Sequence, residues 1–496
     1  MSGETGGGRP AGPGVNDTEL RELVELLQEL IRIPSVNPPG DEILVARYLE
    51  RLLLVEGLAP IVVEPFPGRG SIICRVHGDG SGGDPLLLLS HLDVVPADPA
   101  GWSHDPFGGD VADGYVWGRG TLDMKAMVAM EAQVMRRLAR RARTAGLDPA
   151  RDPIPGLRRD VILCSSADEE DGGAKGAGWL VDNHPQWLHA AGALNEAGGT
   201  SMAFGGVDFY PIQVAEKGYI VYRIHVKGRW GHASVPTSEN AAVLAAKIVT
   251  RLAEPGPVRL TPEFGASLTR AIPHLAARAA RLLASVVQAA SAASPGTADD
   301  AVSTSGAAEA PAVDPAALDA ALRELCDPTL AQTISAISRD TISVGILQAG
   351  LRYNVIPGSA EIEIDCRTLP GTDEPAMRAE LRRRIGEELW SVIDLELMQL
   401  GPAARAPLDS SLYRLLERVV KAHDPRGVPL PTLAPFATDA KHLARIGVPT
   451  YGFSPLRLAP HEGLLDLMHA DDERVPVDAL EWGLPVLWDA VIGFCG

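Results

Sequence analysis

The spacing of hydrophobic positions predicts alternating helices and strands over the first 200 residues. Near the N-terminus the spacing is helical, which predicts one helix ending before Asn37-Pro38-Pro39-Gly40 and a second over 41–56. The run Leu86–Leu89 is apolar throughout, so we expect a strand that is buried on both faces. A helix over 124–142 is expected to have Asp123 at its N-cap. Further strands are predicted at 71–77, 161–165 and 191–194. This alternation indicates an α/β domain with a largely parallel sheet.

A second pattern begins near residue 215 and lasts to about 401. Predicted strands and helices follow one another in the order β-α-β-β-α-β, which indicates a small sheet with its helices on one side. The elements are expected at 219–226, 240–252, 341–347, 361–366, 374–390 and 395–400. The α/β pattern returns after 402, so we predict a domain of 215–401 inserted into one of 17–214 and 402–496. Residues 1–16 and the low-complexity segment 291–315 are expected to be disordered and flexible, respectively.

Composition narrows the class of protein. A chain of 496 residues with 46% hydrophobic and 22% charged residues is expected to be soluble and to form two or more domains. The net charge of −19 argues against a nucleic-acid or anionic-membrane partner. The N-terminus has no signal-peptide pattern. The sequence has no uninterrupted run of ~20 apolar residues, which is the length that crosses a membrane, so no membrane-spanning helix is expected. Single, scattered cysteines suit a reducing compartment, so a cytoplasmic location is expected. The cysteines are Cys74, Cys164, Cys326, Cys366 and Cys495.

Acidic and imidazole side chains follow the predicted strands or begin a helix. They are His91, Asp123, the pair Glu169-Glu170, and Glu196. Because strand ends in an open α/β sheet face one crevice, we expect these groups to converge there. Imidazole and carboxylates together suit one or two divalent ions.

Each of these residues also has a purely structural interpretation. His91 suits the edge of a core, Asp123 a helix N-cap, and the acidic groups and His469 a solvated loop. If the site is real, Asp93, two positions after His91 on an extended segment, can hold one ring nitrogen of that histidine. Glu169 and Glu170 are expected to project in opposite directions, one toward a cation and the other toward its water as a general base.

Six motifs favour the functional interpretation because of their order along the chain. HLDVVP, GRGTLDMKA, DEE, ALNEAGG, GHASVP and H-x-x-D-E-R occur in this sequence as they do in the co-catalytic zinc peptidase family. That family includes aminoacylases, carboxypeptidase G, carboxypeptidase S and succinyl-diaminopimelate desuccinylase. The resemblance implies an α/β catalytic domain, with a mostly parallel mixed sheet and helices on both faces. It also implies an inserted ferredoxin-like domain that acts as a lid and pairs two subunits in a homodimer.

The resemblance assigns a role to each matching residue. It implies two Zn²⁺ ions, or Co²⁺ or Mn²⁺ in their place, bridged by Asp123. His91 and Glu196 would hold one ion, and Glu170 and His469 the other. The residues acting around the ions would be the base Glu169, the orienting Asp93 and the oxyanion-stabilising His232, which in family dimers reaches the partner's active site. Asn354 and Arg367 resemble residues that bind the substrate carboxylate; the alternative for Arg367 is a salt bridge at a strand end.

The implied reaction is amide hydrolysis through a metal-bridging hydroxide. The amino-acid sequences of the motifs resemble the carboxypeptidase S and aminoacylase branches most. Substrates of those branches are N-acyl-amino acids or short peptides with a free C-terminal carboxylate. A dipeptidase, a desuccinylase and a catalytically silent metal-binding scaffold are the alternatives. One departure concerns ATDAKHL (437–443), where many relatives have glycines and an arginine. Lys441 keeps the positive charge there but lacks the planar fork that pairs with a carboxylate.

Overall fold

The computed structural model describes residues 15–496 except 205, 279, 282, 285–317, 321, 324–327 and 460–461. These residues form two compact units. The first contains the described part of Met1–Val214 together with Ala406–Thr432 and Thr438–Gly496; the second contains that of Ala215–Arg405 together with Leu433–Ala437. The segment 291–315, Cys326 and nearly all of 1–16 lie outside the described residues.

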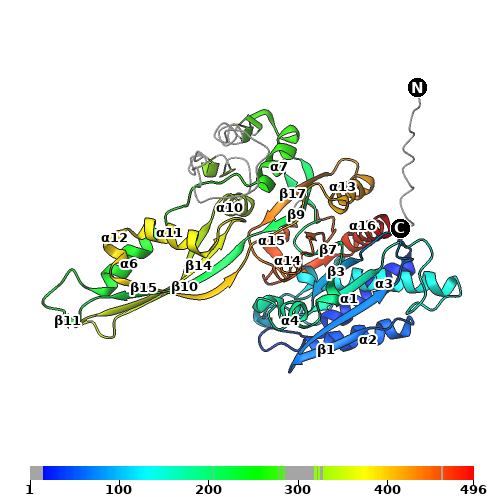
Figure 1. Cartoon of the computed structure of the whole chain (residues 1–496), viewed down its shortest axis with the longest axis horizontal. Helices are drawn as coiled ribbons and strands as arrows, with labels where there is room; N and C mark the ends of the chain where they lie inside the picture. The colour runs from blue at the N-terminus through cyan, green and yellow to red at the C-terminus, as the bar shows by residue number, and fades with distance from the viewer. Residues whose placement is uncertain are drawn as a thin grey trace. The chain divides into compact units, whose positions relative to one another are not determined.

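A mixed sheet with a parallel centre forms the core of the first unit (Figure 1). The order of its strands is β1-β2-β6-β3-β7-β18-β9. The four central strands, β6, β3, β7 and β18, are parallel to one another. The strands are β1 (Ile61–Phe66), β2 (Arg69–Val76), β3 (Leu86–His91), β6 (Val161–Ser166), β7 (Gly192–Asn195), β9 (Val207–Glu216) and β18 (Thr450–Gly452), with β8 (Met202–Phe204) and β17 (Val428–Ala434) beside them. The short strand β16 (Ala404–Arg405) belongs to the second unit, where it pairs with Ala215 and Glu216 at the end of β9. A separate three-stranded sheet contains β4 (Val111–Ala112), β5 (Tyr115–Trp117) and β19 (Arg474–Pro476).

Helices cover both faces of this sheet, and β3 shows why. Leu86 and Leu88 pack into one hydrophobic cluster, with residues of α1, α2, α3 and α16, whereas Leu87 and Leu89 pack into another, with residues of α4 and α14. Successive side chains of a strand point to opposite faces, so an apolar run needs a core on each side. The prediction of a doubly buried strand is confirmed. The helices are α1 (Asp17–Ile31), α2 (Glu42–Val55), α3 (Ala126–Thr144), α4 (Ala177–Asn183), α5 (Pro185–Leu188), α13 (Ser411–His423), α14 (Ala440–Ala444), α15 (Leu464–Leu467) and α16 (Val477–Cys495).

The second unit contains a four-stranded antiparallel sheet of order β12-β14-β10-β15. In chain order its strands and helices follow β-α-β-β-α-β, and the first strand lies between the third and the fourth, which is a ferredoxin-like arrangement. Alternate residues of β10 are buried against α6 and α11. The elements are β10 (Gly218–Lys227), β11 (Gly231–His232), α6 (Ala241–Leu252), α7 (Pro262–Ala271), α10 (Pro328–Ile337), β12 (Thr341–Ala349), β13 (Val355–Ile356), β14 (Ser359–Thr368), α11 (Glu374–Ile385), α12 (Glu387–Trp390) and β15 (Ile393–Gly401).

The single helix predicted over 374–390 is wrong, because it is broken into α11 and α12. Gly386 stands between the two helices with φ of 79°, a backbone conformation that favours glycine and ends a helix. Cys74, Cys164 and Cys366 are buried free thiols that pack into the hydrophobic clusters. Within the described ranges, no helix combines the length and apolar composition needed to span a bilayer.

Candidate active site

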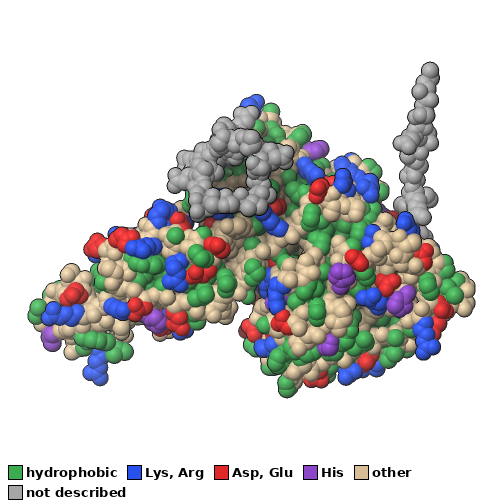
Figure 2. All heavy atoms as spheres, in the orientation of Figure 1, with side chains coloured by type: hydrophobic (Ala, Val, Ile, Leu, Met, Phe, Trp, Pro, Cys, Tyr) green, Lys and Arg blue, Asp and Glu red, His purple; other side chains and the backbone are tan. Residues whose placement is uncertain are grey.

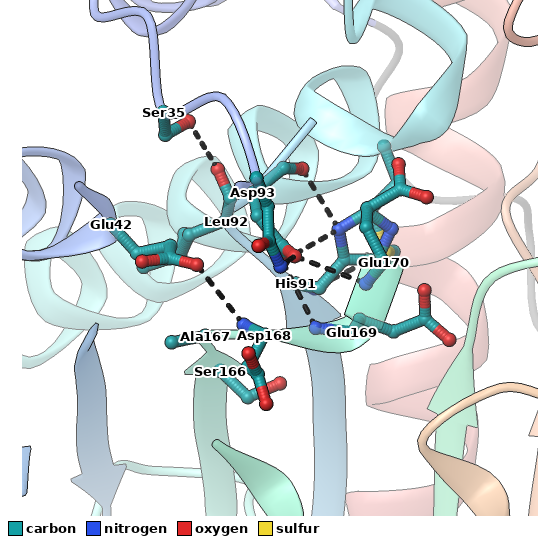
Figure 3. A network of polar contacts seen from close by, with 12 residues as sticks. Ser35, Glu42, His91, Leu92, Asp93, Ser166, Ala167, Asp168, Glu169 and Glu170 are labelled. Atoms are coloured by element: carbon teal, nitrogen blue, oxygen red, sulfur yellow. Dashed lines mark hydrogen bonds and ion pairs between the residues drawn. The ribbon is translucent and has the colours of Figure 1, made fainter. Parts of the chain in front are cut away.

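The carboxyl ends of three parallel strands bring the predicted groups together. His91 is the last residue of β3, Glu196 follows β7, and Glu169 and Glu170 lie just beyond β6. These strands are neighbours in the sheet, so their ends meet at one edge, as expected (Figure 3). Asp123 reaches the same place from the turn before α3, and His469 from the loop after α15.

Asp123 lies between two pairs of side chains. Its Oδ1 is 3.0 Å from Nε2 of His91, and the same nitrogen is 3.6 Å from Oε2 of Glu196. Its Oδ2 is 3.0 Å from Nε2 of His469, which is 3.4 Å from Oε2 of Glu170. Each carboxylate oxygen of Asp123 therefore faces a different imidazole–carboxylate pair. This is a donor arrangement that suits two neighbouring divalent ions.

The predicted N-cap position of Asp123 is wrong. Lys125 is the residue before α3. Asp123 lies two residues earlier, in the kinked turn Thr121–Lys125, where its φ and ψ of −125° and 91° are not helical. Gly120, with φ of 87°, supplies the left-handed bend at the start of this turn. The buried ammonium of Lys125 donates to the backbone oxygens of Leu30 (2.9 Å) and Ile33 (2.8 Å). The turn is thus fixed by the core, and it aims the carboxylate at the two histidines.

Glu169 and Glu170 do not leave β6 as an extended segment, as predicted, but lie in a short 3-10 turn (Glu169–Asp171). The reason is Asp93, whose buried carboxylate accepts the backbone N–H of Glu169 (3.2 Å) and of Glu170 (3.0 Å), as Figure 3 shows. It also accepts the side-chain amide of Asn37 at 2.8 Å. One residue therefore folds the turn that presents both glutamates.

Asp93 also lies against His91. Nδ1 of His91 is 3.1 Å from the backbone oxygen of Asp93 and 3.5 Å from its carboxylate. A carbonyl oxygen only accepts, so Nδ1 carries a hydrogen and Nε2 faces Asp123 and Glu196. That is the orientation in which a neutral histidine binds a metal through Nε2.

Burial and mutual repulsion shift the acidity of the cluster. Burial raises the pKa of Glu196 to about 7 and, together with the charge of Glu196, raises the pKa of Glu169 well above its ordinary value. Burial also raises the pKa of Glu170, whose Oε1 has no hydrogen-bond partner among the described residues. Hydrogen bonds to Asp123 and Glu170 raise the pKa of His469 to about 10. A buried, self-repelling set of carboxylates with an unpaired oxygen fits divalent cations as its missing charge.

Two overlapping groups of ligand atoms each lie within 4.8 Å of one another: those of His91, Glu169 and Glu196, and those of His91, Asp123 and Glu170. Glu169 is thus close enough to the ligand set for either role, ligand or base. Its role as the base stays a prediction.

The remaining predicted residues belong to the second unit. His232, in β11, is exposed, and its Nδ1 is 2.6 Å from Oγ of Ser234. Val355 lies opposite His232 in the β11–β13 ribbon, and Asn354 precedes it in the sequence; its backbone oxygen accepts the N–H of Ala233 at 3.2 Å. Arg367 forms an ion pair with Asp365 at 2.9 Å, the salt bridge that the alternative interpretation described.

Three further residues lie near the site: Arg119 and Glu473 were not predicted, and Lys441 was noted only as a departure from the family pattern. Glu473 and Arg119 form a buried ion pair beside Asp123. Lys441 is buried, donates to the Thr438 oxygen at 2.9 Å, and its charge partly offsets the raised pKa of Glu169. All three lie inside the motifs GRGTLDMKA, H-x-x-D-E-R and ATDAKHL. Their positions inside these motifs were the one feature of the sequence that could have pointed to a role near the site.

Comparisons with known proteins agree with this geometry. N-fatty-acyl-amino acid synthase/hydrolase PM20D1 of Xenopus tropicalis is 28% identical over 483 residues, which cover 94% of this chain and 84% of that protein. Aminoacylase-1 of Homo sapiens is 25% identical over 466 residues, covering 92% of this chain and 91% of that protein. A solved structure, the M20 family metallo-carboxypeptidase Sso-CP2 from Sulfolobus solfataricus, matches with a TM-score of 0.65 at 16% identity, covering 97% of this chain and 99% of that chain. This similarity confirms the predicted α/β fold class.

The family model described as Peptidase family M20/M25/M40 matches residues 87–492, a range that holds every predicted site residue. The resemblance stated from the motifs is therefore confirmed, and the chain belongs to this peptidase family.

Proposed function

We propose that this hydrolase cleaves the amide bond of N-acyl-amino acids, with short peptides that have a free C-terminal carboxylate as the second substrate class. The observation that carries the proposal is Asp123, whose two oxygens each lie 3.0 Å from a different histidine, with Glu169 close by. The names of two relatives, an N-fatty-acyl-amino acid synthase/hydrolase and an aminoacylase, favour the first class.

Two divalent ions are part of the proposal, and zinc suits the imidazole and carboxylate donors best. His91 and Glu196 would hold one ion and Glu170 and His469 the other, with Asp123 between them. Such ions, when bound, polarise a carbonyl oxygen and lower the pKa of water. Cobalt and manganese accept the same donors.

The chain's own residues supply the proton transfers. A carboxylate oxygen of Glu169 lies within 4.8 Å of ligand atoms of His91 and Glu196, so Glu169 is placed to take a proton from the attacking water. It then gives this proton to the leaving amine. Asp93 keeps Glu169 in place through its backbone N–H. His232, which is exposed and whose Nδ1 lies 2.6 Å from Oγ of Ser234, is proposed to stabilise the oxyanion.

Recognition of the substrate carboxylate is assigned to Asn354 and Arg367. Arg367 has a competing partner in Asp365, so binding a substrate carboxylate requires it to exchange or share that ion pair. A positive charge for the same purpose is available at Lys441, close to Glu169.

The test is release of free amino acid from N-acetyl-, long-chain N-acyl- and N-succinyl-amino acids and from dipeptides, with zinc or cobalt and with chelator. Chelator-sensitive release from the N-acyl-amino acids is expected. Preference for dipeptides or N-succinyl substrates would move the chain to the dipeptidase or desuccinylase class. Turnover of no substrate by the metal-loaded protein would favour a silent metal-binding scaffold.

We also propose a homodimer formed through the second unit. The edge strands β12 and β15 are largely exposed, with apolar Ile346 and Leu347 on β12. Hydrophobic side chains are also exposed near β11, including Trp230 (54%), Leu351 (84%) and Tyr353 (98%). Figure 2 shows hydrophobic side chains on the surface at the left of the view. Exposed edge strands with apolar side chains favour pairing. Sedimentation analysis should give the mass of a dimer, and Leu347→Lys should shift it toward the monomer; a monomeric wild-type chain would overturn this proposal.

A cytoplasmic location is proposed from the cysteines alone, because the four described ones are buried free thiols. Rapid alkylation of the protein in cells should find all thiols reduced. Recovery with a disulfide would contradict this location.

A further inference from the structure

A buried ion pair connects the two loops that present Asp123 and His469. Arg119 follows β5, and Glu473 precedes β19, and these strands pair so that Trp117 lies opposite Arg474. This places Arg119 and Glu473 side by side, with Nη1 of the arginine 2.6 Å from Oε2 of the glutamate. Both side chains are almost fully buried.

Glu473 accepts hydrogen bonds along the whole turn that carries Asp123. Its Oε2 accepts the backbone N–H of Gly120 at 3.1 Å as well as the arginine. Its Oε1 accepts the N–H of Leu122 at 2.7 Å and that of Asp123 at 3.3 Å. Every acceptor position that this carboxylate uses is therefore directed at Arg119 or at the backbone of the Asp123 turn.

Arg119 holds the opposite loop. Its Nη2 donates to the backbone oxygen of His469 at 3.2 Å, and its guanidinium lies 5.1 Å from the ring centre of Trp102. That loop needs external support, because His469 and Asp472 both have positive φ, 61° and 59°. A second tie fixes it at Asp472, whose carboxylate accepts the N–H (2.6 Å) and the hydroxyl (2.8 Å) of Ser103.

We propose that Arg119 and Glu473 are a positioning pair that sets the second metal position, between Asp123, Glu170 and His469. The two proposed metal positions differ in their support. His91 and Glu196 stand at the ends of β3 and β7, so the sheet itself fixes them. His469 stands on a loop of strained backbone whose distance from Asp123 is set by this ion pair. Loosening the pair also loosens Asp123, which both positions share. The second position in addition loses the support of His469, so it should empty first, while the first keeps His91 and Glu196.

The inference rests on the proposed two-metal function, and its test is the metal content and kinetics of Glu473→Gln. A glutamine presents an NH₂ group where one oxygen stood, and that group cannot accept from Arg119 or from a backbone N–H. After dialysis against a limiting metal buffer, the variant should retain about one ion per subunit where the wild type retains two. Its kcat should fall about 10- to 100-fold, the usual effect of a residue that supports a metal ligand, with a smaller change in KM. Added zinc should restore part of the lost kcat.

Glu56→Gln is the matched control. Glu56 is also buried and pairs with arginines of α3 (Arg136, Arg140 and Arg143), but it contacts none of the proposed ligands. It should lose stability without losing metal. Arg119→Lys is a second variant for the case that Glu473→Gln does not fold; it keeps the charge next to Glu473, cannot reach the His469 oxygen at the same time, and should give a milder loss of the second ion.

The outcomes separate this inference from the proposed function. If the wild type binds two ions and hydrolyses its substrate, but the folded Glu473→Gln or Arg119→Lys protein retains both ions and full kcat, the positioning role is overturned. The same holds if Glu56→Gln loses metal equally, because the effect is then general destabilisation. If the wild type itself does not bind two ions, the proposed function fails first.

Discussion

Replacing Asp93 with asparagine should damage the position of Glu169 more than any other feature of the site. Asp93 is fully buried and uses both oxygens: Oδ1 accepts the N–H of Glu169, and Oδ2 accepts the N–H of Glu170 and the amide of Asn37. Asparagine keeps only one acceptor oxygen. The better of its two orientations keeps that oxygen at Oδ2, where two donors lie within 3.0 Å, and leaves an NH₂ group facing the Glu169 N–H and, at 3.5 Å, Nδ1 of His91.

The expected cost follows from this count. One buried N–H without a partner costs about 1–3 kcal/mol, which is the predicted loss in the free energy of unfolding. The turn relieves part of this cost by moving Glu169 away, and displacement of a reacting group by about 1 Å can lower the rate on the order of 100-fold. Because the ligand Glu170 keeps its hydrogen bond in this orientation, metal content should fall less than kcat.

The assay combines urea unfolding, metal analysis and steady-state kinetics on the best N-acyl-amino acid. Asp424→Asn is a matched control, since Asp424 is also buried and accepts two backbone N–H groups, of Arg426 and Gly427, together with the hydroxyl of Tyr210. Both N–H groups lie on its Oδ1, and the Tyr210 hydroxyl on Oδ2 can accept from the new NH₂ group, so this variant should lose less stability and keep its activity. Equal kcat in the two variants would refute the assignment of Asp93 to the site.

Other predictions concern the base, the buried acid of α3 and the metal. Glu169→Gln should retain its metal and lose about 10²–10⁴-fold in kcat, measured by the same amino-acid release; retained turnover would contradict its role as base. Burial raises the pKa of Glu131 to about 8, and its interaction with the hydroxyl of Ser90 offsets only part of this shift. The native state therefore keeps this proton while the unfolded state, with its ordinary pKa near 4.5, releases it, so stability should fall as pH rises between these values. Glu131→Gln, which does not ionise, should gain on the wild type by about 1 kcal/mol per pH unit in urea titrations from pH 5 to 8, and a gap that is independent of pH would contradict the shift. Removal of metal by chelator should lower the thermal midpoint, and zinc should restore it, because ions that bind only the folded state stabilise it; an unchanged midpoint would argue against a built metal site.

The strand-end residues were predictable because their placement follows from local pattern alone. Leu86–Leu89 is apolar at every position, so it had to lie in the middle of a sheet, and His91 had to stand at its carboxyl end. The same reasoning placed Glu196 after β7. Because the two strands are parallel, these residues lie at one edge of the sheet however far apart they are in the sequence.

The turns between the strands and helices were not predictable from local pattern. Helix α3 begins two residues later than predicted, so Asp123 lies in the turn before its N-cap. Glu473, 350 positions later in the sequence, fixes that turn by accepting its backbone N–H groups. The 3-10 turn of Glu169 and Glu170 depends on Asp93, 76 and 77 positions earlier. Backbone conformation at these places is set by tertiary hydrogen bonds, and no periodicity of the chain records them. The motifs marked the residues without giving their geometry.

Locating the ions in a crystal would test whether the site binds two metal ions on either side of Asp123. Crystals grown with zinc and measured on both sides of its absorption edge should show two anomalous peaks, on either side of Asp123. We expect one peak within about 2.0–2.2 Å of His91 and Glu196 and the other at that distance from Glu170 and His469. A single peak, or a second ion bound by Glu169 in place of Glu170, would contradict it.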